Sequence, residues 1–295
     1  MRKLVIGCGY LGERVAKAWR DAGHDVTILT RSAAHADRFR DAGFQAVIGD
    51  VTDLDSLREL PAADTVLYAV GFDRSAGPSM RDVYVNGLHN VLRALTDPVS
   101  RFIYVSSTSV YGQSQGESID ESSPCEPTQA SGTICLEAES LVEELGHQKT
   151  DGEQDCHAVV VRSAGLYGPG RLLRRIESLK NREPIDGNPE AYLNLIHVDD
   201  LASAVLAIDD VDQPDRLYLA CDDRPITRRA YYTQLAKCLD TPPPVFPSDT
   251  TDDQSENLGK RCSNRRLREE LGLTLRFPTI DEGLPHAIIR AVNQP

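Results

Sequence analysis

The chain has 295 residues, of which 45 are acidic and 32 basic, giving a formal net charge of -13. This acidic balance disfavours nucleic acid and anionic membranes as partners, because like charges repel. The seven cysteines show no metal-binding spacing, and their odd number indicates reduced thiols in a cytoplasm. No stretch approaches the roughly 18 apolar residues of a membrane span, and residues 1–12 lack the pattern of a signal peptide. We therefore expect a cytoplasmic protein.

The chain opens with a short apolar run, Leu4 to Ile6, that breaks into a glycine-rich turn and then into a helical pattern. A strand that turns tightly into a helix presents backbone N–H groups and the positive helix end to a diphosphate. Glycines let the backbone approach the phosphates and let the helix pack on the strand. The turn predicts a dinucleotide site formed by Gly7, Gly9, Tyr10, Leu11 and Gly12.

The first 164 residues alternate short apolar strands with helical patterns. Strands are expected at 2–7, 25–30, 45–48, 64–70, 101–106 and 157–163, and helices near 10–21, 32–42, 53–60, 79–96 and 130–146. Such alternation is typical of a parallel sheet covered on both faces. We expect residues 1–164 to form a dinucleotide-binding α/β domain, a doubly wound parallel sheet (Rossmann fold) of about seven strands.

The end of the second strand bears on which nicotinamide dinucleotide is bound. NAD-binding units place an acidic residue about 20 positions beyond the glycines, where it bonds the ribose hydroxyls. This chain has Thr30, Arg31 and Ser32 there, without a carboxylate. A charged contact from Arg31 to a 2′-phosphate is worth roughly 1.5–3 kcal/mol. We expect NADP, with NAD as the alternative. The alternative to a cofactor role for Arg31 is that of a solvated arginine at the start of the next helix.

The carboxyl ends of later strands supply further cofactor candidates, because such folds bind ligands at that edge. Asp50, which follows the third strand, is placed to meet the adenine edge, or else belongs to the start of the next helix. The candidates are Asp50, Val51, Ala69, Val70, Gly71 and Asn86.

Beyond residue 164 the pattern becomes mixed. A turn at 168–170 precedes short strand and helix patterns, and polar loops are expected at 146–155 and 241–256. We expect residues 165–295 to form a small C-terminal α/β substrate-binding lobe, intertwined with the first domain. Arg171 is a candidate ligand for a substrate diphosphate, although basic residues are common on wet helix faces. His197 with Asp199 and Asp200 resembles a metal site, but an aspartate that caps a helix after a strand explains the two acids better, so no metal is expected.

Several segments resemble the short-chain dehydrogenase/reductase superfamily, in its extended or atypical NAD-dependent epimerase/dehydratase branch. They lie at 84–90, 105–112, 162–170, 195–200 and 260–264. The glycine spacing departs from the usual one and indicates an atypical subgroup, similar to proteins labelled nucleoside-diphosphate-sugar epimerases. The resemblance implies hydride transfer between nicotinamide and a sugar nucleotide or another polar hydroxy/keto compound. It also places Ser107, Thr108 and Arg162 beside the substrate, with Ser107 bonding its oxygen.

The expected catalytic helix departs from the family. Members carry a tyrosine, and a lysine four residues later, after the serine loop. Alignment on Pro127 and Glu139 puts Ser131 at the tyrosine position and Cys135 at the lysine position. The pair shares one helical face, but serine is a much weaker acid than a phenol and a thiol carries no fixed positive charge. General acid–base catalysis is worth about 10²–10⁴ in rate, so its loss is serious.

Three explanations remain open. Another group supplies the proton, such as Tyr111, Ser107 or water; or Cys135 is itself the acid; or the protein is a catalytically silent NADP-binding sensor or regulator. We expect an oxidoreductase in which Tyr111 is the substitute acid. Its partners are expected to be a small-molecule substrate and at most a second copy of the chain, as a monomer or homodimer.

Overall fold

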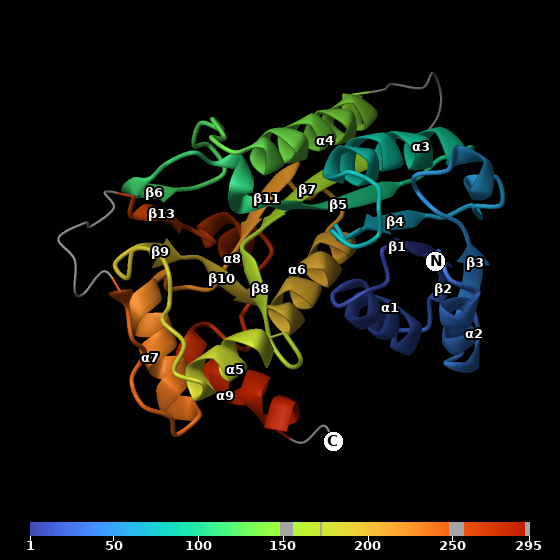
Figure 1. The fold of residues 1–295 in the computed structure, drawn as a ribbon. Coiled ribbons are helices and arrows are strands. Elements are labelled where there is room, and N and C mark those ends of the chain that lie inside the picture. The colour runs from blue at the N-terminus through green and yellow to red at the C-terminus, as the bar shows by residue number, and fades with distance from the viewer. Residues whose placement is uncertain (148–155, 172, 248–256, 293–295) are drawn as a thin grey trace. The chain divides into compact units, whose positions relative to one another are not determined.

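The computed structural model describes residues 1–147, 156–171, 173–247 and 257–292 (Figure 1). The chain divides into two compact units, each built from three segments. Unit 1 comprises Met1–Tyr111, Cys125–Arg162 and Ala202–Tyr218; unit 2 comprises Gly112–Pro124, Ser163–Leu201 and Leu219–Pro295. A single boundary at residue 164 would therefore separate segment 112–124 from the rest of unit 2 and segment 202–218 from the rest of unit 1.

A seven-stranded parallel sheet forms the core of unit 1, in the order β11-β7-β5-β4-β1-β2-β3. In chain order the strands are β1 (Arg2–Ile6), β2 (Asp25–Thr30), β3 (Gln45–Ile48), β4 (Thr65–Tyr68), β5 (Arg101–Ser107), β7 (His157–Ser163) and β11 (Leu217–Ala220). The order runs outward from β1 in both directions, so the predicted doubly wound sheet is confirmed. Such a reversal creates a crevice at the carboxyl ends of the strands, where ligands bind.

Helices cover both faces of this sheet, which explains its continuous apolar strands. All four residues of β4 are buried. Figure 1 shows α3 and α4 on one face and α1 and α2 on the other. The bounds are α1 (Gly12–Asp21), α2 (Ala33–Asp41), α3 (Gly87–Ala94) and α4 (Ala130–His147).

Two predicted helices differ from the structure. The segment 53–60 forms only a short 3₁₀ turn, η1 (Leu54–Leu57). The helix predicted over 79–96 begins as a π-helical turn, η2 (Asp82–Asn86), which continues into α3. Each residue of a π-turn bonds five positions along the chain, and such turns occur frequently at functional sites.

One short strand from beyond residue 164, β11, belongs to the sheet of unit 1 and lies beside β7. The backbone N–H of Val160 in β7 donates to the Arg216 carbonyl at 2.9 Å. The preceding helix, α6 (Val198–Asp210), is fixed at its end by a buried ion pair between Lys3 Nζ and Asp209 Oδ2 at 2.6 Å. These two contacts return the chain to the sheet, which β11 extends beyond β7.

Unit 2 is a mixed α/β assembly of three two-stranded sheets and short helices. The sheets pair β6 (Gln115–Ile119) with β13 (Gly259–Cys262), β8 (Gly165–Tyr167) with β10 (Leu195–His197), and β9 (Tyr192–Leu193) with β12 (Ile226–Thr227). The helices include α5 (Leu173–Lys180), α7 (Arg228–Cys238), α8 (Arg265–Glu270) and α9 (Ile280–Val292). Its core gathers the side chains of Tyr167, Tyr231, Leu235, Phe246 and Leu284.

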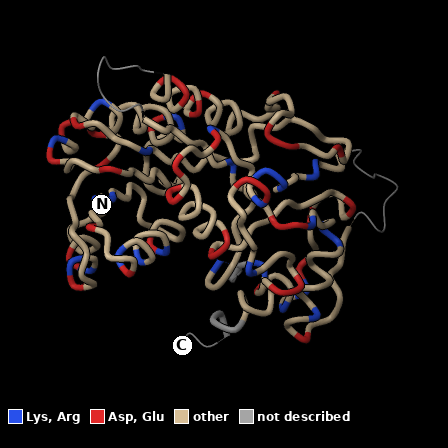
Figure 2. Tube along the Cα trace, turned by 180° about the vertical axis from the view of Figure 1, so that it is seen from behind, with Lys and Arg blue, Asp and Glu red and all other residues tan. Residues whose placement is uncertain are grey.

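The loops predicted at 146–155 and 241–256 fall largely outside the described residues. Among the helices that the structure describes, none is both long and apolar enough to span a membrane. Acidic and basic residues are interspersed along the chain (Figure 2).

Candidate functional site: a glycine turn and the sheet edge beside it

The glycine turn between β1 and α1 is built by close backbone packing. Gly7 has φ +92°, and a Cβ there would lie 2.5 Å from the backbone of Ala69 and Val70. A Cβ on Gly12 would lie 2.5 Å from the Gly7 carbonyl oxygen. These two positions therefore require glycine for the fold itself. Gly9 differs, because no atom lies within 4 Å of its ideal Cβ position.

The open position at Gly9 adjoins the start of α1. The capping residue of this helix is Leu11, which supplies no side-chain hydrogen bond to the first turn. Backbone N–H groups at such a helix start carry a partial positive charge and suit an anion. Arg14 Nη1 donates to the Tyr10 carbonyl at 2.6 Å, and its guanidinium stacks on the Tyr10 ring. The turn thus fits a dinucleotide diphosphate, for which Gly9 leaves room.

The end of β2 carries the residues predicted to choose the dinucleotide. Thr30 is half-buried, whereas Arg31 is exposed. Ser32 caps α2, since its Oγ accepts the His35 N–H at 3.4 Å. The pKa of Asp73 is lowered, mainly by hydrogen bonds from Ser75 and to a smaller degree by the charge of Arg31. Arg31 therefore lies near the loop that follows β4.

Asp50 and Asn86, two further cofactor candidates, make hydrogen bonds with residues close to them in the sequence. Asp50 Oδ1 accepts from the Thr52 N–H at 2.9 Å and from the Thr52 hydroxyl at 2.8 Å. Val51 is buried, and a Cβ on Gly87 would approach its side chain to 2.8 Å. Asn86 is exposed, and its amide donates to Asp82 Oδ1 at 3.1 Å.

Ser107 ends β5, and its Oγ accepts the Ser109 N–H at 3.1 Å at the start of the 3₁₀ turn η3 (Thr108–Val110). Both Ser107 and Thr108 are half-buried. Tyr68 pairs with Tyr104 in the parallel register of β4 and β5. β5 runs three residues beyond this pair to Ser107, whereas β4 ends at Tyr68 and is followed by Ala69–Gly71. The structure thus places the predicted Ser107 and Ala69–Gly71 on neighbouring strand ends.

Arg162 is the centre of a buried polar network in unit 1. Its Nη2 bonds Glu139 Oε2 at 2.7 Å and its Nε bonds both carboxylate oxygens at 3.1 Å. Nη1 donates to the Tyr111 hydroxyl at 2.9 Å. Glu139 also accepts the Ser106 hydroxyl at 2.5 Å. Burial opposes the charge of Arg162, but the bonds to Glu139 outweigh it and keep the pKa of Arg162 above its ordinary value.

This network bears on two predicted roles. The side chains of Arg162 and Glu139 are only 8% and 4% exposed, and the guanidinium is directed at Glu139 and Tyr111. Tyr111 is 2% exposed. We therefore do not retain Arg162 as a substrate ligand, because its guanidinium is bonded to Glu139 and Tyr111. Nor do we retain Tyr111 as the substitute acid, because its side chain is buried. A strand-end arginine gives no sequence signal of such a distant partner.

Ser131 and Cys135 lie on α4, at the positions of the family's tyrosine and lysine. Ser131 is half-buried, whereas Cys135 is 2% exposed. The Ser109 hydroxyl donates to Cys135 Sγ at 3.8 Å. Burial raises the pKa of the Cys135 thiol, and the charge of Glu139 adds to the effect. Cys135 is thus a neutral buried thiol, which is unsuited to nucleophilic chemistry.

Tyr84 is the residue on this sheet edge to which the sequence assigns no role of its own. Its hydroxyl accepts the backbone N–H of Phe72 at 3.1 Å, and its side chain is half-buried on η2. Tyr84 is visible in the sequence only as part of the 84–90 segment. The contact that places it depends on the conformation of the loop after β4.

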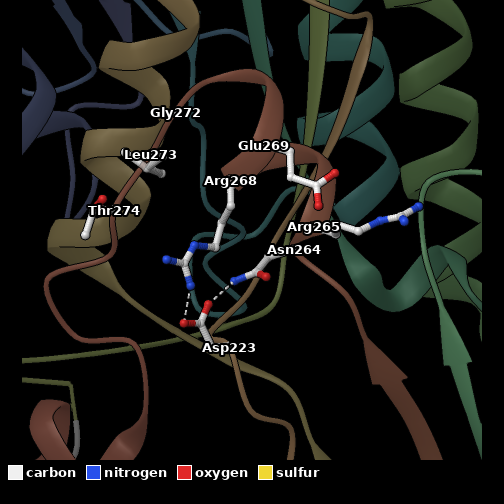
Figure 3. A pocket seen from close by; sticks show the side chains of 8 residues that line it. All are labelled: Asp223, Asn264, Arg265, Arg268, Glu269, Gly272, Leu273 and Thr274. Atoms are coloured by element: carbon white, nitrogen blue, oxygen red, sulfur yellow. Dashed lines mark hydrogen bonds and ion pairs between the residues drawn. The ribbon is translucent and has the colours of Figure 1, made fainter.

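In unit 2, Arg171 is exposed after the turn at 168–170. A surface pocket of this unit is lined by Asp223, Asn264, Arg265, Arg268, Glu269, Gly272, Leu273 and Thr274 (Figure 3). Asp223 bonds Arg268 and Asn264 within it, whereas the Arg265 side chain extends away (Figure 3). The polar groups drawn together here therefore stabilise the pocket wall.

A cluster of possible metal ligands also lies in unit 2 and comprises His197, Asp199 and His286. His197 Nδ1 accepts the Asp199 N–H at 3.2 Å, and its Nε2 lies 3.1 Å from His286 Nδ1. Both nitrogens of this fully buried ring are thus hydrogen bonded. The aromatic rings of Tyr167 and Phe277 pack against it. We assign no metal to this cluster.

Comparison with known proteins agrees with the glycine turn and the sheet. Residues 4–219 match the model of the NAD dependent epimerase/dehydratase family. The chain is 28% identical over 288 residues to protein YeeZ of Escherichia coli K12, which covers 94% of this chain and 97% of YeeZ.

Solved structures share the architecture over nearly the full length. A Methylobacillus flagellatus protein, provisionally named an NAD-dependent epimerase/dehydratase, has a TM-score of 0.79 and 30% identity, with 99% of each chain covered. MoeE5 in complex with UDP-glucose and NAD shares the fold at a TM-score of 0.77 and 20% identity, again over 99% of each chain. By its matched segment, its sheet and its glycine turn, the chain belongs to the NAD-dependent epimerase/dehydratase family.

Proposed function

We propose that the protein binds NADP, with NAD as the weaker ligand, along the carboxyl ends of β1, β2 and β4. The observation that carries this proposal is the open space at Gly9 beside a helix start that no side chain caps. The exposed Arg31, with Ser32, supports the choice of NADP, since a guanidinium favours a 2′-phosphate where a carboxylate would repel it.

The chemistry we propose is oxidation or reduction of a sugar nucleotide or another polar hydroxy/keto compound. Bound nicotinamide supplies a hydride acceptor or donor. Ser107 stands at the carboxyl end of β5, where its hydroxyl would bond the substrate oxygen, with Thr108 beside it. The structural neighbour MoeE5 holds UDP-glucose together with NAD, which supports this substrate class.

A second function is a silent NADP-binding sensor. It is favoured by Ser131 and Cys135, because neither residue reproduces the phenol and ammonium pair that the family resemblance implies. The two functions share a cofactor and differ in turnover. Hydride exchange between the cofactor and UDP-glucose, monitored by the absorbance of the reduced nicotinamide, would support the enzyme. Cofactor binding without hydride exchange across a panel of sugar nucleotides and carbonyl compounds would support the sensor.

Calorimetry on a matched pair of glycine variants tests the cofactor site. We expect Gly9→Ala to retain the wild-type fold, since its methyl group enters open space, but to weaken NADP binding tenfold or more (about 1.4 kcal/mol) by blocking the diphosphate. Gly7→Ala should instead lose about 1–3 kcal/mol of stability, because of its positive φ and its contact with Ala69. Absence of binding heat in the folded wild type would refute the proposal. Unchanged affinity in Gly9→Ala would move the diphosphate away from this turn.

A further inference from the structure

A half-buried phenol lies beside the candidate cofactor site. Tyr84 accepts the N–H of Phe72 at 3.1 Å, and the two rings meet edge to face with centroids 6.4 Å apart. Phe72 lies in the loop directly after β4. Phe72 thus holds Tyr84 beside the loop that follows β4, through its backbone N–H and its ring.

The residues that follow β4 also pack against the glycine turn. The backbone of Ala69 and Val70 occupies the space that a Cβ on Gly7 would need. The neighbouring strand β5 pairs with β4 up to Tyr68 and Tyr104 and then continues to Ser107, while the chain after β4 leads to Phe72. The glycine turn, Ser107 and the loop that contacts Tyr84 therefore all adjoin the carboxyl ends of β1, β5 and β4.

Tyr84 is also close to the helix whose catalytic pair is absent. The π-turn η2, which carries Tyr84, packs directly against α4, the helix of Ser131 and Cys135. A charge on Cys135 would raise the pKa of Tyr84, which places the thiol and the phenol in one neighbourhood. Tyr84 and the Ser131/Cys135 pair are therefore carried by two elements that pack against each other.

The electrostatics of Tyr84 keep its hydroxyl protonated. Burial raises the pKa of Tyr84, and the Phe72 N–H only partly offsets this effect. The phenol therefore carries its proton at neutral pH. Tyr111 is less accessible to a substrate, because it is buried whereas Tyr84 is half-buried.

We propose that Tyr84 is the proton donor that replaces the missing tyrosine, an inference that rests on the proposed NADP-dependent function. In the reductive direction, the hydride of NADPH goes to the substrate carbonyl carbon. The Tyr84 O–H bond breaks as its proton passes to the carbonyl oxygen, which becomes an alcohol. The phenolate regains a proton from water, and oxidation follows the reverse course.

The test uses fluorine NMR on the full chain labelled with 3-fluorotyrosine, in which fluorine makes the phenols more acidic and easier to titrate. The resonance missing from Tyr84→Phe identifies Tyr84. We expect this phenol to ionise at least about one pH unit lower with NADP⁺ bound than with NADPH, because only the oxidised nicotinamide is positively charged. The matched control is Tyr192, a half-buried phenol of unit 2 identified by Tyr192→Phe, whose titration should be the same with both cofactor forms.

The outcomes separate this inference from the function beneath it. Equal ionisation of Tyr84 with NADP⁺ and NADPH, while calorimetry shows both bound, overturns the inference alone. Absence of calorimetric binding overturns the proposed function and this inference with it. If UDP-glucose is turned over, Tyr84→Phe should lower the rate by about 10²–10⁴ with unchanged NADP affinity, and a wild-type rate overturns the role of Tyr84. If it is not turned over, the titration decides.

Discussion

Arg31 presents an exposed guanidinium at the end of β2, near Asp73. We expect Arg31→Asp to lower the affinity for NADPH ten- to a hundredfold relative to NADH, because a favourable charged contact worth roughly 1.5–3 kcal/mol becomes a repulsion. Competitive titration with the two reduced cofactors, followed by nicotinamide fluorescence, measures the ratio. Arg93→Asp makes the same charge change at an exposed site on α3 and should leave the ratio unaltered. An unchanged ratio in Arg31→Asp would remove this residue from cofactor selection.

At the scale of single residues, the sequence predicts those features that depend on local geometry. Gly7 is predictable because its positive φ and its close approach to β4 follow from the tight strand-to-helix turn. The roles of Arg162 and Tyr111 are not predictable in this way. Their partners lie 23 and 51 residues from Arg162 along the chain, and only the fold brings Glu139 under the guanidinium. A strand-end arginine therefore resembles a ligand-binding residue until its buried counterion is known.

Among the elements, α4 is attached to the sheet by the carboxylate of Glu139, which bonds Arg162 of β7 and Ser106 of β5. Removing one partner of a buried ion pair leaves the other charge without compensation. We expect Glu139→Leu to lower the free energy of unfolding by about 3–5 kcal/mol. Urea denaturation of the purified variant measures this loss.

A double variant and a surface pair serve as controls for the Glu139 measurement. Glu139→Leu combined with Arg162→Leu should recover part of the loss, because it removes both buried charges. The pair of Arg58 and Asp55 is 77% and 78% exposed, and Arg58→Leu should change stability by less than about 1 kcal/mol. A small loss in Glu139→Leu, similar to that of the surface variant, would contradict a stabilising role for the buried pair.

Element pairing limits what the sequence can predict about the sheets. The alternating pattern predicts the inner strands well, because each is a continuous apolar run such as β4. The edge strand β11 is four residues long, and its membership depends on α6 returning the chain to β7. Likewise β6 and β13 pair across nearly half of the sequence. Short strands of this kind carry little periodicity, and their partners are set by tertiary contacts.

On the scale of the whole molecule, the two units share covalent and secondary structure. The chain passes from one unit to the other five times, and α6 and β11 each span the division. A helix that belongs to both units cannot unfold with one and persist unchanged in the other. We therefore expect one cooperative transition, in which the fluorescence of Trp19, the single tryptophan, reports the unfolding of the entire chain.

This expectation can be tested with a carboxyl group of unit 2. Asp222 is 3% exposed and accepts the Tyr167 hydroxyl at 3.1 Å, while its Oδ1 has no partner among the described residues. Burial raises the pKa of Asp222 from 3.8 to about 8. Between these values the folded chain retains a proton that the unfolded chain releases. Stability is therefore lost as the pH rises through this window, by at most about 1.4 kcal/mol per pH unit.

We expect Asp222→Asn to remove this slope, since its amide cannot ionise. Urea unfolding from about pH 5 to about pH 8, monitored by Trp19 fluorescence and by far-UV circular dichroism, measures both proteins. The stability of the wild type relative to the variant should fall as the pH rises. Because Trp19 lies in unit 1 and Asp222 in unit 2, the same slope in both signals requires the two units to unfold together. Parallel pH profiles of the two proteins would show that Asp222 is ionised in the fold, and a slope seen by dichroism alone would show that the units unfold separately.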